Sequence, residues 1–204
     1  PIRDLQVQWK SCGTLVGSYN FLMYGSLTYV GEKLSRDKSY AQSPVAFWLF
    51  GVGCLNSFTN YVHHTYHLPQ TEVVKWVAFI VSMMEVIILV KLMIDLGKML
   101  SSRKADAEFC GRGGWLTQAK YWTVGMLFTS IVISVPTFNT LIHGTQLVMG
   151  HAMGATVGID SLVLLGTSSW LVLELKGAAI KARMDAPITK VSILLVSLSL
   201  AVLV

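Results

Sequence analysis

Apolar segments long enough to cross a lipid bilayer recur along the whole chain. A membrane-spanning helix needs about 20 mostly apolar residues to cover roughly 30 Å of hydrocarbon. The composition agrees, because 53% of the 204 residues are hydrophobic, 13% are charged and the mean hydropathy is +0.56. A chain this apolar is not an ordinary soluble domain. The sequence therefore predicts an all-α fold, a polytopic membrane helical bundle.

The pattern predicts about six transmembrane helices that belong to a single membrane domain over residues 1–204. The last of these segments is only just long enough to cross the bilayer. The predicted helices cover residues 13–31, 45–67, 72–100, 120–136, 141–175 and 188–204.

Basic residues are unevenly distributed among the connections between these helices. Of the 16 Lys and Arg residues, 12 lie in or beside the first, third and fifth connections, and the second and fourth have none. Since cytoplasmic connections carry the excess of basic residues, we expect the amino terminus outside and the carboxyl terminus inside a bacterial-type inner membrane. The 12 residues are Lys33, Arg36, Lys38, Lys98, Arg103, Lys104, Arg112, Lys120, Lys176, Lys181, Arg183 and Lys190.

Two function classes find no support in the sequence. The net charge is +5, but the basic residues lie in short connections between spans, which gives nucleic acid no binding surface. The cysteines Cys12, Cys54 and Cys110 are widely spaced, odd in number and form no C-x-x-C motif. They therefore argue against a disulfide framework and against a cysteine metal site.

His151 lies deep within the apolar segment 141–175. An ionisable side chain at such a depth is costly, so it usually faces a cavity, a metal or a cofactor. With a rise of 1.5 Å per residue, His151 lies roughly 12–15 Å deeper than the outer end of this helix. Because no acidic partner is evident, a ligand role is favoured over a histidine that is merely hydrogen-bonded in the core.

His63 and His64 end the second predicted helix. Adjacent residues of a helix project about 100° apart, which suits a metal approached from different angles better than the ordinary i, i+4 zinc pair. His63 and His67 have the i, i+4 spacing and offer that ordinary pair. An equally weighted alternative places these histidines in the headgroup region, where water solvates them.

Met153 follows His151 by two residues, so the two side chains project from nearly opposite faces of one helix. Such a helix offers one axial ligand to each of two haems, although Met153 as core filler is the more common case. Gly150, Gly154 and Gly158 recur every four residues and form a smooth strip. This strip suits a closely packed helix or, as the less favoured alternative, a porphyrin edge.

Glu85 is a lone acid in the apolar segment 72–100, with no basic residue within one or two helical turns. A carboxyl group buried in this way tends to hold a proton near neutral pH. Beside a redox centre it would serve as a proton donor. The alternative is a structural, hydrogen-bonded glutamic acid.

Together these residues resemble the carboxyl-terminal half of the large subunit of nitric oxide reductase, in the haem–copper oxidase superfamily. The resemblance rests on His63-His64, on Glu85 21 residues later, and on His143-Gly144-Thr145 followed by His151. It implies that the chain corresponds to helices six to eleven of a twelve-helix subunit. It also implies that His151 is the proximal ligand of a high-spin, b-type haem, that His63 and His64 bind a non-haem iron or copper, and that Glu85 supplies protons.

The sequence departs from this family at the remaining ligand positions. The first segment lacks the family's third metal-binding histidine, for which Asn20 or Cys12 would be a weak substitute. Met153 stands where the family has a second histidine for a low-spin haem, and a thioether ligand gives a higher potential than histidine. The family's amino-terminal half is absent from this chain, so the resemblance implies a partner membrane subunit that supplies it.

The implied function is an oxidoreductase subunit that reduces nitric oxide to nitrous oxide within a complex. A cytochrome c-type or quinol electron donor is implied as a further partner. Nitric oxide is preferred over dioxygen because Glu85 matches the reductase pattern and no histidine–tyrosine pair suited to an oxidase is evident. A terminal oxidase subunit and a non-catalytic subunit for assembly or electron transfer remain the alternatives.

Overall fold

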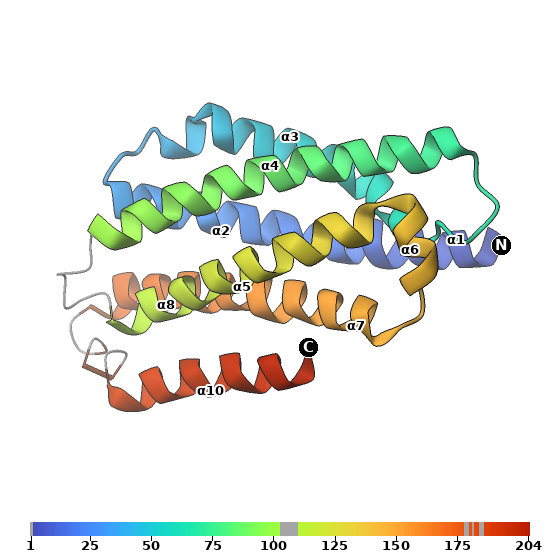
Figure 1. Ribbon diagram of the computed structural model, residues 1–204. Coiled ribbons are helices and arrows are strands. Elements are labelled where there is room, and N and C mark those ends of the chain that lie inside the picture. Colours follow the sequence, from blue (N-terminus) through green and yellow to red (C-terminus); the bar gives the residue numbers. More distant parts are fainter. Residues whose placement is uncertain (1, 103–109, 178–179, 181, 184–185) are drawn as a thin grey trace.

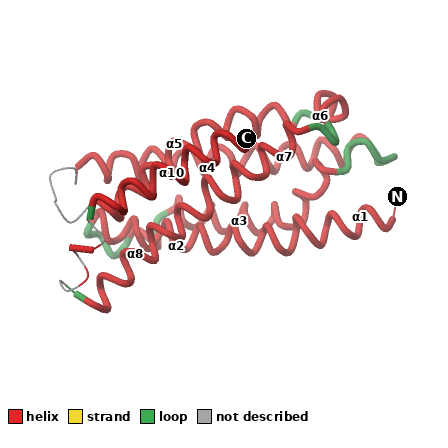
Figure 2. Tube along the Cα trace, turned by 90° about the horizontal axis from the view of Figure 1, so that it is seen from below, coloured by secondary structure: helices red, strands yellow, loops and turns green. Residues whose placement is uncertain are grey.

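The chain forms an all-α bundle, as the sequence predicts. The structure is a computed structural model that describes residues 2–102, 110–177, 180, 182–183 and 186–204. Within these residues it contains helices and no strands. Apart from the short α6, which turns away at one end, the long helices run side by side along one common axis (Figures 1 and 2).

The described residues form six helical rods. The first rod is continuous from α1 through a π-helix into α2, and the fifth is continuous from α7 through a second π-helix into α8. A short helix, α6, and a 3-10 turn, η2 (Tyr40–Gln42), lie between rods. The rods and α6 are α1 (Ile2–Gln8), η1 (Trp9–Val16) and α2 (Gly17–Ser35); α3 (Pro44–Thr59) and η3 (Asn60–His64); α4 (Glu72–Ser102); α5 (Cys110–Ser134) and α6 (Pro136–Ile142); α7 (Gln146–Met153), η5 (Gly154–Ser161) and α8 (Leu162–Lys176); and α10 (Pro187–Leu203).

By length and hydropathy, two helices of the described chain are able to cross a membrane alone. They are Glu72–Ser101, with 30 residues, and Gln146–Lys176, with 31 residues. The helices Gly114–Ser134 and Pro136–Ile142 meet this test together, but they are bent by 99° at their junction. The apolar helix Pro187–Leu203 is shorter than this test requires.

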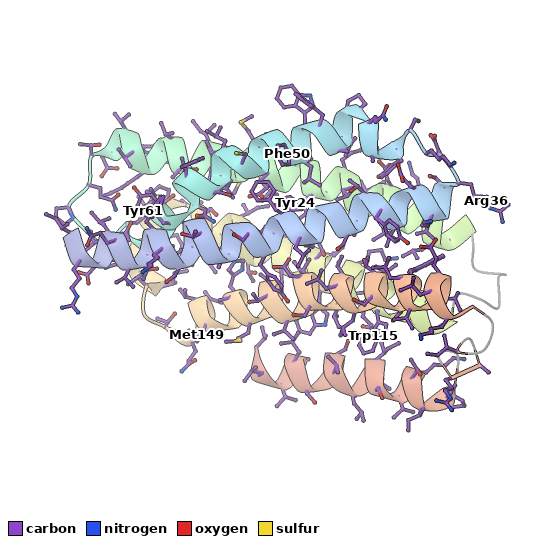
Figure 3. The ribbon with its side chains drawn as sticks, turned by 180° about the vertical axis from the view of Figure 1, so that it is seen from behind. Tyr24, Arg36, Phe50, Tyr61, Trp115 and Met149 are labelled. Atoms are coloured by element: carbon purple, nitrogen blue, oxygen red, sulfur yellow. The ribbon has the colours of Figure 1, made fainter. Side chains whose placement is uncertain are left out.

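The connections fall at the two ends of the bundle in strict alternation. Helices α2, α4 and α8 end where α3, α5 and α10 begin, at the end marked by Arg36 in Figure 3. The other connections lie at the opposite end, toward Tyr61 (Figure 3). The connections rich in Lys and Arg therefore lie at one end of the bundle, as expected for helices that alternate in direction. Arg103, Lys104 and Lys181 lie outside the described residues.

The predicted helix over 141–175 is wrong at its start. Leu141 belongs to α6, and α7 begins only at Gln146. Between them Gly144 has a φ of 78°, in the left-handed region that glycine adopts without steric cost. The first turn of the predicted helix is therefore a reversal at the end of the bundle, and His143 lies in that reversal.

Residues at the helix ends explain other boundaries. The Ser43 hydroxyl accepts a hydrogen bond from the Ala46 backbone N–H at 3.3 Å, and Pro44 occupies the first helical position of α3. A serine cap followed by proline is a strong start signal for a helix. Arg36, with a φ of 59°, closes α2 in the left-handed conformation. These two signals fix the first connection.

The glycine strip of the fifth rod is a helix-packing surface. A Cβ atom added at Gly158 would lie 2.7–3.0 Å from ring atoms of Trp122, and one at Gly154 would overlap Met126. Met126 and Trp122 of α5 occupy the space beside Gly154 and Gly158 that a porphyrin edge would need. The interpretation of this strip as a helix-packing surface is therefore confirmed. Close helix approach through small residues is the usual basis of packing in membranes.

Candidate functional site

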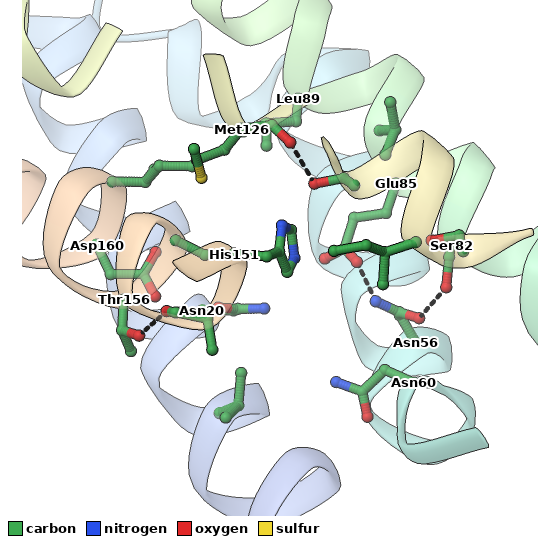
Figure 4. A pocket seen from close by; sticks show the side chains of 18 of the residues that line it. Asn20, Asn56, Asn60, Ser82, Glu85, Leu89, Met126, His151, Thr156 and Asp160 are labelled. Atoms are coloured by element: carbon green, nitrogen blue, oxygen red, sulfur yellow. Dashed lines mark hydrogen bonds between the residues drawn. The ribbon is translucent and has the colours of Figure 1, made fainter. Parts of the chain in front are cut away.

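A cavity of about 310 Å³ lies inside the bundle (Figure 4). Its volume falls at the lower end of the range of about 300–1,000 Å³ that is typical of ligand pockets. Residues from rods one to five contribute to its walls, so the cavity depends on the whole arrangement of these helices. Its polar lining consists of Cys12, Asn20, Tyr24, Asn56, Asn60, His63, His64, Ser82, Glu85, Thr123, Ser130, Ser134, His151, Thr156 and Asp160.

His63 and His64 lie in the 3-10 turn η3 rather than in the α-helix expected to end there. Their ring centroids are 4.2 Å apart and the rings are inclined by 43°. Both line the cavity. Nδ1 of His63 is buried and has no hydrogen-bond partner among the described residues.

His67 lies apart from this pair. Its ring stacks on that of His143, with centroids 3.8 Å apart and an interplanar angle of 28°. His67 is exposed and does not line the cavity. The i, i+4 pair of His63 and His67 is therefore not the arrangement that the fold presents to the cavity.

His151 lines the cavity and is held by Thr129. The Thr129 hydroxyl donates to the Met126 carbonyl oxygen at 2.9 Å and lies 3.1 Å from His151 Nδ1. When the hydroxyl directs its proton to Met126, it can accept a hydrogen bond from His151 Nδ1–H. In that tautomer of His151, Nε2 carries a free lone pair. Ligating histidines are commonly oriented in this way through their second nitrogen.

Glu85 is held at both carboxyl oxygens. The Tyr24 hydroxyl donates to Oε1, and the Asn56 side-chain N–H donates to Oε2. Asn56 in turn accepts a hydrogen bond from Ser82 at 3.5 Å. Figure 4 shows Glu85, Asn56 and Ser82 of this chain along one wall of the cavity. Both roles considered for Glu85 are compatible with this geometry, because a held carboxyl is well positioned as well as structurally supported.

The two substitutes considered for the missing histidine also line the cavity. Asn20 extends into it from α2 (Figure 4), and the buried Cys12 contributes from η1. The Cys12 thiol donates to Gln8 Oε1 at 3.7 Å. Asn60 donates to the Cys12 carbonyl oxygen at 3.1 Å, but its own side-chain oxygen is buried without a partner.

Met153 is not among the residues that line this cavity. It lies on the same rod as His151, at the end of α7, and is partly buried. An axial role for Met153 stays a prediction that concerns a second, separate haem.

Comparison with known proteins places the chain in a family. The family model for cytochrome c and quinol oxidase polypeptide I matches residues 1–204. The chain therefore belongs to this family of haem–copper-type membrane oxidoreductase subunits, which bind haem with copper or iron and work with electron donors in multisubunit respiratory complexes. No curated protein and no solved structure matches the chain. The superfamily and the integral membrane location expected from the sequence are confirmed.

The residues around the cavity fit one of the family's two metal groups better than the other. Nε2 of His151 is available to a haem iron, and the unpaired Nδ1 of His63 is available to a second metal. Among the described residues, however, no group of three or more His, Cys, Asp or Glu side chains is arranged to hold a metal ion. The described residues thus bring His151, His63 and His64 to one cavity, and the assignment of a haem or a metal to them stays a prediction.

Sequence reasoning missed the residues that hold these groups in place. Tyr24, Asn56 and Thr129 are uncharged, and such residues are frequent in membrane helices. Their role follows only from which helices cross at the cavity. Asp160 also lines the cavity, and an acid nine residues after His151 in an apolar segment is a sequence signal that could have found it.

Proposed function

We propose that the chain is the carboxyl-terminal half of a nitric oxide reductase-like subunit that reduces nitric oxide to nitrous oxide at a haem beside a non-haem iron or copper. The observation that carries this proposal is that His63, His64, Glu85 and His151 line one internal cavity. These four residues come from η3, α4 and α7, which are separate in sequence. Ionisable residues inside a membrane bundle are costly unless they serve a site.

In this proposal His151 binds the high-spin haem through Nε2. Thr129 fixes the tautomer and the plane of the ring, so that the lone pair points along one direction. When bound, the haem supplies the iron at which the gas is bound and reduced. Much of the exposed surface of the cavity is apolar, which suits the binding of a small uncharged gas.

His63 and His64 are the proposed ligands of the non-haem metal. Neutral imidazoles suit both iron and copper. Since two imidazoles do not complete a coordination sphere, we propose that Asn20, water or a residue of the partner chain supplies the rest. Asn20 is the strongest of these within the chain, because its amide extends into the same cavity.

Glu85 is the proposed proton donor to this site. Its two hydrogen bonds, from Tyr24 and Asn56, keep the carboxyl group at the cavity wall in either protonation state. A carboxyl that exchanges protons within reach of the reacting gas supplies the protons that the reduction consumes.

We further propose that the amino terminus faces the outside of a bacterial-type inner membrane, and that a second membrane subunit and a cytochrome c-type or quinol donor complete the complex. Single cysteines at Lys38 and Gln70, in a chain with its native cysteines replaced by serine, test the orientation. A membrane-impermeant thiol reagent added outside should label the Gln70→Cys variant and leave Lys38→Cys unlabelled. The reverse pattern would overturn the topology.

A non-catalytic subunit is the second candidate. The observation that favours it is the lack, among the described side chains, of a three-ligand His, Cys, Asp or Glu metal group. In this candidate the chain keeps the fold and one haem and serves assembly or electron transfer.

Metal analysis of the purified complex separates the two candidates. The reductase-like function predicts one non-haem iron or copper per copy of the chain, lost in the double variant His63→Ala/His64→Ala. The double variant His67→Ala/His143→Ala is the matched control, because it removes two histidines outside the cavity and should keep the metal. A complex that contains haem but no such metal supports the non-catalytic candidate.

A further inference from the structure

Asp160 is a buried acid for which the proposed function has no use. It lies across the cavity from Glu85 (Figure 4) and lines the same space. Its exposed fraction is 4%, and within the described chain its carboxyl forms no hydrogen bond or ion pair. It belongs to η5, one of the two π-helical stretches, and both stretches border the cavity. Single π-turns inside helices are rare and frequently mark functional sites.

No basic side chain of the described residues lines the cavity beside Asp160. Glu85 faces Asp160 across the cavity from α4 (Figure 4). The other titratable side chains of the cavity are Tyr24 on α2, Cys12 on η1, His63 and His64 on η3, and His151 on α7, and no Lys or Arg lines it.

Two negative charges that face each other across a cavity are costly when no cation lies beside them. No described Lys or Arg lines this cavity, so the pair Glu85 and Asp160 is arranged to share a proton.

The surroundings of the two carboxyl groups decide where that proton lies. Glu85 accepts hydrogen bonds at both oxygens, from Tyr24 and Asn56, and hydrogen bonds to a carboxylate stabilise its charged form. Asp160 has no such donor among the described residues. When two acids with different surroundings share one proton, the acid without donors keeps it.

We propose that Asp160 is a second proton-binding group of the cavity, which holds the shared proton at rest and exchanges it with Glu85. In the exchange the proton leaves an Asp160 Oδ atom and binds a Glu85 Oε atom, and the negative charge moves in the opposite direction. A cavity of about 310 Å³ has room for the water that would bridge the two groups, since liquid water takes about 30 Å³ per molecule. This inference goes beyond the proposed function, and its charge argument counts only the chain's own side chains.

Infrared spectroscopy of the purified complex in detergent tests this proposal. At neutral pH the wild-type complex should show a protonated carboxylic acid band that shifts in deuterium oxide and on labelling with ¹³C-aspartate. The Asp160→Asn variant should lack this band, and the Glu85→Gln variant should keep it. Asp37→Asn is the matched control, because Asp37 is exposed in a connection and its substitution should leave the band unchanged.

Two results would overturn the proposal. One is a wild-type complex in which aspartate labelling shifts no carboxylic acid band, a measurement that holds even if the variant fails to fold. The other is a band that shifts only with ¹³C-glutamate, which would place the proton on Glu85. A complex without haem that still shows the aspartate band would contradict the proposed function and leave the role of Asp160 intact.

Discussion

Replacing Thr129 by valine tests whether His151 is prepared to bind a haem iron. Valine has the shape of threonine without the hydroxyl, so the variant removes the hydrogen-bond acceptor 3.1 Å from His151 Nδ1. The loss of one such bond costs about 0.5–1.5 kcal/mol, or roughly a factor of two to ten in affinity. Loss of the fixed tautomer adds to this, because the partners of ligating histidines typically change metal affinity about 10–100-fold. We expect haem to bind about tenfold more weakly.

The fold itself should tolerate this change. The Met126 carbonyl oxygen, which loses the Thr129 donor, still accepts a hydrogen bond from Ser130 Oγ at 2.8 Å. The assay is the transfer of haem from the complex to an excess of a haem-scavenging protein, together with the iron–histidine vibration in resonance Raman spectra. Thr129→Ser keeps the hydroxyl and should behave as the wild type. If Thr129→Val retains haem as tightly as Thr129→Ser, with the same vibration, the orientation argument is refuted.

Two further predictions concern packing and pH. Gly158→Ala should lower the stability of the complex by about 1–3 kcal/mol, because the new methyl group would overlap the Trp122 ring. Thermal unfolding measures this loss, and Gly125→Ala is the control, because its added Cβ has nothing within 4 Å. If the two variants are equally stable, the glycine strip is not tightly packed. Burial and the nearby His67 lower the pKa of His143 below its usual 6.5. The stacked pair should therefore contribute fully to folding stability above about pH 6.5, and this contribution should be lost as the pH falls through the lowered pKa. His143→Ala should remove that part of the pH dependence of thermal stability, and an unchanged profile would contradict the assignment.

The fold was predictable where long apolar runs end in clear signals. The segment expected over 72–100 is the helix Glu72–Ser102, and the segment expected over 188–204 is the helix Pro187–Leu203. The turn between α6 and α7 was not predicted, because the residues around Leu141 are as apolar as those of the helix that follows. Only the backbone conformation of Gly144 reveals that the chain reverses there. Hydropathy alone does not distinguish a turn of this kind from the start of a span.

The candidate site was predictable in its ionisable residues and not in the residues that support them. His63, His64, Glu85 and His151 stand out from apolar surroundings, and the structure brings them to one cavity. The role of Thr129 depends on α5 crossing α7 at the height of His151, and no spacing in a single helix encodes that crossing. The same holds for the contacts of Glu85, whose partners lie on two other helices.

The haem spectrum of the His151→Ala variant tests the central claim most directly. The purified wild-type complex should show the optical signature of a high-spin haem, and that signature should vanish in His151→Ala while the chain still inserts into the membrane. His143→Ala, in the turn that precedes α7 and outside the cavity, should leave the spectrum unchanged. A His151→Ala complex with the wild-type high-spin spectrum would contradict the claim that this cavity holds the haem through His151.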